Sequence, residues 1–76
     1  MKGKHRKSEF VVCVKNRGYR VSLELRKIYQ ALPDAEAEAH GLVRVVDESG
    51  EDYLYPTSFF IPIQVPAPVE RALSAS

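Results

Sequence analysis

The sequence predicts a mainly β protein, a small five-stranded barrel with a short helical insertion over residues 34–40 and a C-terminal helical turn. Short runs rich in β-branched and aromatic residues alternate with glycine, proline and asparagine turn signals. A length of 76 residues leaves room for one domain with one modest core. We expect a disordered basic arm over residues 1–8, the barrel over residues 9–65, and a helical turn and tail over residues 66–76.

The first half of the chain combines one clear strand with one ambiguous segment. Residues 9–14 are apolar on both faces, which predicts a buried strand, and residues 16–18 form a turn signal. In residues 21–32, the spacing of the apolar side chains fits both a helical stripe and strand alternation. The β-rich sequence on both sides favours an extended segment, a turn near residues 26–27, and a new strand through Leu32.

A proline, an acid and a glycine frame the helical insertion. Pro33 ends the preceding strand, because it lacks an amide donor and restricts the residue before it. Strong helix formers follow, and Asp34 is placed to cap the first amides of the helix. Gly41 is typical of a helix end.

A hairpin is predicted next. The apolar runs over residues 42–47 and 52–55 are separated by a Ser49-Gly50 turn signal, in which glycine supplies the positive φ. The two runs should therefore pair as antiparallel strands. Acids on both sides of the turn predict a solvated tip.

Prolines help to predict the last strand and the helical tail. Residues 56–58 predict a short helical turn, and residues 59–65 predict the final strand. Pro62 cannot donate to a ladder, so this strand should lie at a sheet edge. In the tail, Pro68 suits a helix start, and three apolar residues share one face. They are Val69, Ala72 and Leu73.

Charge divides the chain into two halves. Residues 1–27 hold nine basic and two acidic residues, whereas residues 28–76 hold two basic and eight acidic residues. This asymmetry suits either a basic arm for an acidic partner or strands of opposite charge that neutralise each other within the fold. We favour neutralisation within the fold. The net charge of +1 gives little long-range attraction for nucleic acid.

The sequence also predicts the cellular compartment of the protein. The lone Cys13 excludes an internal disulfide in this sequence and is typical of a reducing compartment. The longest unbroken apolar run, residues 10–14, is far shorter than the roughly 18 residues of a membrane helix. The basic start and this short run lack the cleavage site of a signal peptide. We expect a cytoplasmic protein with no membrane contact.

Two short motifs carry a resemblance to a known family. The run Gly50-x-x-x-Leu54-Tyr55-Pro56-Thr57-Ser58-Phe59-Phe60 resembles the ending of Src homology 3 barrels, which reads Gly, two apolar residues, Pro, Ser, Asn, Tyr and Val. The segment Leu23-x-x-x-Lys27-x-Tyr29-x-x-Leu32 is similar to the opening of many bacterial barrels of this type, and the layout resembles a group of short bacterial proteins. The resemblance covers roughly residues 9–65 and implies a Src homology 3-like barrel.

The sequence departs from that family at its ligand groove. The polyproline groove of the family needs a tryptophan, and this chain has none. The Ala-Leu-Tyr-Asp-Tyr motif of the first strand is replaced here by the apolar residues 10–14. The resemblance therefore implies the fold without the ligand.

Aromatic residues are the candidate binding residues. They supply large contact areas at low entropic cost, which suits recognition of another protein. The sequence leaves open whether they line one groove, together with Tyr19, or fill the barrel core. Tyr53 should be the most exposed, because it lies on a two-sided strand beside Leu54. The predicted protein-binding residues are Tyr29, Tyr53, Tyr55 and Phe59.

The alternative function is nucleic-acid binding through the basic arm and the first strands. Lysine and arginine contacts to phosphates release counterions and make binding strongly salt-dependent. Small barrels also bind single strands through aromatic residues beside basic grooves. The competing interpretation is a solubilising arm that has no ligand. The residues of this alternative are Lys2, Lys4, Arg6, Lys7, Lys15, Arg17 and Arg20.

Catalytic and metal-binding patterns are missing from the sequence. Cys13 is the only thiol and lies in an apolar strand, where a thiol stays protonated, and nothing indicates that His40 activates it. The histidines and the cysteine lack zinc-ligand spacing, and the acids of residues 47–52 lack calcium-loop spacing. We predict a protein that is not an enzyme, with no cofactor, metal or small-molecule substrate, whose partner is another protein.

Overall fold

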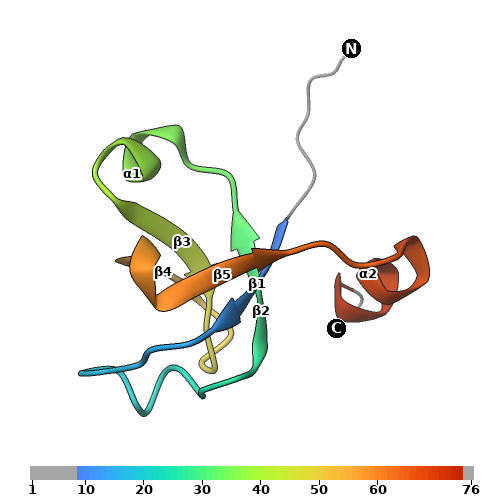
Figure 1. Cartoon of the computed structure of the whole chain (residues 1–76), viewed down its shortest axis with the longest axis horizontal. Coiled ribbons are helices and arrows are strands. Elements are labelled where there is room, and N and C mark those ends of the chain that lie inside the picture. Colours follow the sequence, from blue (N-terminus) through green and yellow to red (C-terminus); the bar gives the residue numbers. More distant parts are fainter. Residues whose placement is uncertain (1–8, 75–76) are drawn as a thin grey trace.

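The chain forms one antiparallel sheet with short helices at its periphery (Figure 1). The computed structural model describes residues 9–74, and the predicted disordered arm over residues 1–8 lies outside the described residues. Within that range the elements, in chain order, are β1 (Glu9–Cys13), β2 (Ile28–Leu32), α1 (Ala35–Ala39), β3 (Leu42–Val46), β4 (Asp52–Pro56), the 3-10 helix η1 (Thr57–Phe59), β5 (Phe60–Ile63) and α2 (Ala67–Ser74).

The predicted mainly β fold is confirmed, but the sheet is not a closed barrel. The strand order is β4-β3-β2-β1-β5, so β4 and β5 form the two edges and do not pair with each other. The three-residue η1 links these edges directly, which requires the sheet to curl. Pro56 in β4 and Pro62 in β5 each remove a ladder donor from an edge, and this helps to keep the sheet open.

The ambiguous segment of the first half is a long loop followed by a strand. Residues 14–27, here named the long loop, contain no strand, and β2 begins at Ile28. The turn predicted near residues 26–27 is confirmed. Arg26 adopts a φ of 63°, and its N–H donates to the Cys13 carbonyl at 2.7 Å. A continuous helix across this segment is therefore excluded.

Most local predictions for the second half are confirmed. Asp34 caps α1 by accepting a hydrogen bond from the N–H of Ala37 at 3.0 Å. The hairpin forms in the expected place, and Gly50 has a φ of 84°. β5 lies at an edge as Pro62 predicts, although it ends at Ile63 rather than at Val65. The tail is a helix of eight residues, longer than a turn.

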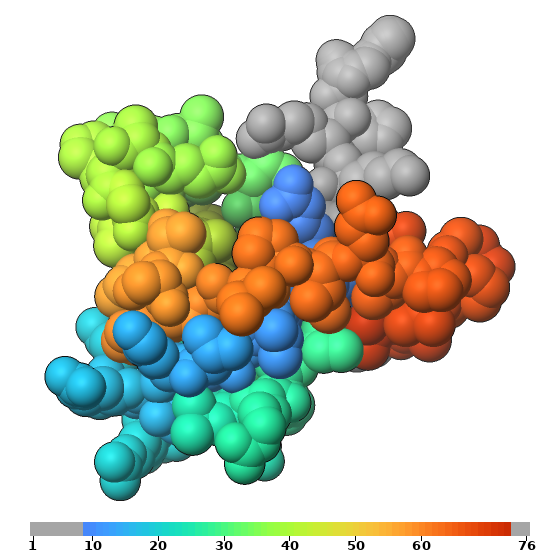
Figure 2. Space-filling model, in the orientation of Figure 1, coloured from blue at the N-terminus to red at the C-terminus, as the bar shows by residue number. Residues whose placement is uncertain are grey.

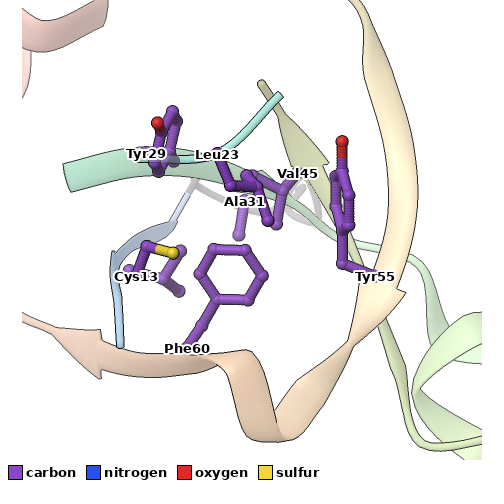
Figure 3. Close-up of a cluster of buried hydrophobic side chains, with 8 residues drawn as sticks. Cys13, Leu23, Tyr29, Ala31, Val45, Tyr55 and Phe60 are labelled. Carbon is purple, nitrogen blue, oxygen red and sulfur yellow. The ribbon is translucent and has the colours of Figure 1, made fainter. Parts of the chain in front are cut away.

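The core lies on the inner face of the curled sheet. Leu23 comes from the long loop, and Cys13 and Val45 come from strands; these three side chains are fully buried. Tyr29 and Tyr55 also belong to this cluster, which further contains Val11, Ala31 and Phe60, and the two tyrosine hydroxyls leave it on the same side (Figure 3). Through Leu23 the long loop is thus part of the core, and this contact holds the loop against the sheet.

Candidate functional site

The long loop is fixed to the sheet at both ends. The N–H groups of Val14 and Lys15 both donate to the Phe59 carbonyl, at 2.8 and 3.3 Å. At the other end, the N–H of Cys13 donates to the Lys27 carbonyl at 2.9 Å. The amide side chain of Asn16 bridges the loop by donating to the carbonyl of the buried Leu23 at 3.0 Å. These bonds hold the loop beside η1.

Glu48 clamps the long loop against the hairpin. Its N–H donates to the Ser22 carbonyl at 3.0 Å, and its carboxylate accepts from the Tyr29 hydroxyl and the Lys27 ammonium. The Tyr29 oxygen in turn accepts from the N–H of Glu24 at 2.8 Å. The bonds from Lys27 and Tyr29 hold the pKa of Glu48 below its ordinary value. Burial and the bond to Glu48 raise the pKa of Tyr29.

The structure divides the four predicted aromatic binding residues. Tyr53 is 52% exposed, as expected, and Phe59 is half-buried. Tyr29 and Tyr55 are only 6% and 2% exposed, so their rings mainly fill the core. Tyr29 and Tyr55 therefore share one buried cluster, whereas Tyr53 and Phe59 keep exposed surface. β2 pairs with β1 in a register that places Tyr29 opposite Val11, and both side chains join the inner cluster.

Tyr19 from the long loop joins the remaining aromatic residues. Its ring meets Tyr55 edge to face at 5.0 Å between centroids and Phe59 at 6.0 Å. An open hollow of about 320 Å³ includes Tyr19, Tyr53 and Tyr55 in its lining. We name Tyr19, Tyr53 and Phe59, together with the buried Tyr55 on which Tyr19 packs, the aromatic surface.

Asp47 supports the aromatic surface from beneath. Its carboxylate accepts from the Tyr55 hydroxyl and from both the N–H and the hydroxyl of Ser49. Burial alone raises the pKa of Asp47, but the bonds from Ser49 and Tyr55 outweigh burial and hold that pKa below its ordinary value. Burial and the bond to Asp47 raise the pKa of Tyr55 to about 12. Tyr55 is consequently a neutral, fixed platform for Tyr19.

A basic groove runs beside the aromatic surface. It has a volume of about 430 Å³ and lies between the long loop and η1; Figure 2 shows the loop (blue to cyan) against residues 57–63 (orange). Three cations predicted for the alternative function line it, and none forms an ion pair with another described residue. The lining residues are Val14, Lys15, Asn16, Arg17, Arg20, Leu25, Ser58 and Phe59.

The remaining cations of that prediction cannot be placed. Lys2, Lys4, Arg6 and Lys7 lie outside the described residues. Val14 and Leu25 of the groove were not among the predicted binding residues. The sequence places Val14 in a strand that is apolar on both faces and Leu25 in an alternating apolar pattern, and no local signal places either residue beside Phe59.

The acids of the hairpin tip are engaged in structural contacts. Glu48 pairs with Lys27, which gives an ion pair between the basic half and the acidic half of the chain, whereas Lys15, Arg17 and Arg20 of the basic half form none with a described residue. Asp52 pairs with Arg44 at 2.9 Å, and Glu51 accepts from the Tyr53 hydroxyl at 3.2 Å. Arg44 also reaches Asp34 at 2.8 Å and ties α1 to the hairpin.

Cys13 and His40 occupy different environments. The Cys13 thiol is fully buried and donates to the Lys15 carbonyl at 3.2 Å, and burial raises its pKa. His40 is exposed at the end of α1, with Nδ1 2.9 Å from the Glu36 carbonyl oxygen. Residues 9–74 hold no group of three or more histidine, cysteine or acidic side chains that could bind a metal.

Comparisons with protein-family models, with curated proteins and with solved structures found no match for this chain. Among the described helices, none is long and apolar enough to cross a membrane.

Proposed function

We propose that the protein is a small non-enzymatic binding module that recognises another protein through the aromatic surface. One observation carries this proposal: the exposed Tyr19 packs edge to face on both Tyr55 and Phe59, beside the exposed Tyr53. Exposed tyrosines on a rigid base suit protein interfaces, because the rings bury large areas and lose little conformational entropy. The hydrogen bond from the buried Tyr55 hydroxyl to Asp47 provides that rigid base.

We also propose that the architecture is a Src homology 3-like barrel in an open form. The strand order β4-β3-β2-β1-β5, the long loop between β1 and β2, and the short 3-10 helix before β5 support this proposal. The chain has no tryptophan for a polyproline groove, so the ligand of that family is not proposed here. We likewise propose a cytoplasmic location, because the single cysteine has no partner in this sequence for an internal disulfide.

Site-specific photo-crosslinking tests the binding surface. A photoreactive aromatic amino acid replaces Tyr53, and in a matched control it replaces Val69, which is exposed on the distant helix α2 (Figure 1). We expect a discrete protein adduct from position 53 and none from position 69, and Tyr19→Ala should reduce the adduct. Equal adducts from both positions would contradict the proposal.

Nucleic-acid binding is the second candidate function. It is favoured by the three cations of the basic groove, which form no ion pair within residues 9–74, and by Phe59 beside them. Titration with a short oligothymidylate at increasing salt is the test. A steep salt dependence that disappears in Lys15→Ala with Arg17→Ala would support it. No binding at low salt would remove it.

A further inference from the structure

We propose that the basic groove binds an acidic, extended segment of the partner protein. The carboxylates of that segment would meet Lys15, Arg17 and Arg20, and its apolar side chains would lie on Val14, Leu25 and Phe59. The inference rests on the proposed protein-binding function and names the chemistry of the partner.

The distribution of ion pairs supports an anionic ligand. The long loop holds five basic residues and one acid, yet Lys27 alone among these cations pairs with a described carboxylate. The other described cation with ionic partners is Arg44, outside the loop. Lys15, Arg17 and Arg20 therefore face one groove as like charges, which repel one another. Carboxylates in the groove would relieve that repulsion.

The floor of the groove supports a ligand that also has apolar groups. Val14 and Leu25 are exposed aliphatic side chains, and Phe59, which packs against the core, lines the groove with them. An inorganic anion would leave these surfaces in water, whereas a peptide would cover them and gain the burial energy. The loop bonds to the Phe59 carbonyl and the Asn16 bridge hold the groove open in advance, so little ordering is needed on binding.

The surroundings favour a peptide over a nucleic acid. Val14 and Leu25 offer no ring face for a base to stack on, and Tyr19 already packs against Phe59. The adjoining hollow shares Asn16, Arg20 and Leu25 with the groove and adds two carboxylates, those of Glu24 and Glu48, against one further cation, Arg26. A long polyanion that extends past the groove would enter this hollow. A short acidic segment would end before it.

Fluorescence anisotropy with a defined probe tests the inference. The probe is a labelled short peptide that alternates glutamate with leucine, and the comparison probes are the matching serine–leucine peptide and a short oligothymidylate. We expect the acidic peptide to bind and to shift the amide resonances of Val14, Leu25 and Phe59. Arg17→Glu with Arg20→Glu should weaken binding at least about tenfold.

A control variant separates the groove from general electrostatics. Arg71→Glu reverses a charge on α2, away from the long loop (Figure 1), and should leave the affinity for the acidic peptide within about twofold. Equal losses in both variants would overturn the inference, as would tighter binding of the oligothymidylate or of the serine–leucine peptide. If no probe peptide binds while position 53 still crosslinks to a protein, this inference fails and the proposed function stands.

Discussion

The two sides of the long loop are built for different tasks. On its inner side, Leu23 is fully buried, and Ser22 and Lys27 are bound by Glu48. On its outer side, Arg17 and Arg20 form no ion pair with a described residue. One segment therefore combines side chains that hold the fold with side chains that are available to a ligand.

Stability and binding therefore depend on different positions within the same loop. Substitutions on the inner side should unfold the protein without a specific effect on a ligand. Substitutions on the outer side should change binding and leave the fold intact. The substitution that should lower the unfolding free energy most lies on the inner side.

Leu23→Ala should cause the largest loss of stability. Removal of a fully buried leucine side chain leaves a cavity between the loop and the sheet, which costs about 2–5 kcal/mol of unfolding free energy. The matched control is Leu25→Ala, because Leu25 is 41% exposed on the same loop and should lose less than about 1 kcal/mol. Urea denaturation measures both. Similar losses of unfolding free energy in the two variants would show that the inner and outer sides of the loop do not differ in their contribution to stability.

Asp47→Ala should rank second. The substitution leaves the buried Tyr55 hydroxyl and the Ser49 N–H without their acceptor, at a cost of about 1–3 kcal/mol. Glu51→Ala is the control, since the Glu51 carboxylate accepts a hydrogen bond from the exposed Tyr53 and its backbone bonds are kept, and its effect should stay within about 0.5 kcal/mol. Thermal unfolding followed by circular dichroism ranks the two. If Asp47→Ala unfolds at the same temperature as the parent chain, Asp47 does not have the structural role described for it.

Local sequence signals predicted much of this fold. Asp34 as a cap, the Ser49-Gly50 turn and Pro62 at an edge act over a few residues, so their outcomes could be read from neighbouring side chains. The break near Arg26 was also visible, because apolar alternation fails there. The conformation of Arg26 was not visible, since a positive φ in a residue other than glycine depends on the bond to Cys13.

The candidate site was predicted only in part, because contacts distant in sequence create it. Lys15, Arg17 and Arg20 stood out as basic residues, but their meeting with Phe59 depends on the bonds from the long loop to η1. Tyr29 was assigned to the binding surface, whereas strand register turns it into the core. A shift of one residue in that register would have exposed it, and the sequence alone does not fix this choice.

Acid should weaken the inner side of the loop through Glu48. Its pKa in the folded protein lies below the ordinary value of 4.5, because of the bonds from Lys27 and Tyr29. The charged carboxylate thus stabilises the fold fully above about pH 4.5, and this contribution disappears as the pH falls through the folded pKa. Urea midpoints between pH 7 and pH 3 should fall less steeply in Glu48→Gln than in the parent chain. Parallel curves would show that Glu48 does not clamp the loop.

Arg17→Glu with Arg20→Glu should have the smallest effect on stability. Both side chains are exposed and unpaired among the described residues, so the unfolding free energy should stay within about 0.5 kcal/mol of the parent value. A slight gain is expected, because the reversal removes repulsion between like charges on the loop. Urea denaturation and the anisotropy titration on the same preparation measure both properties. A loss of stability as large as that of Asp47→Ala would mean that these cations support the fold, and the division between the two sides of the loop would be wrong.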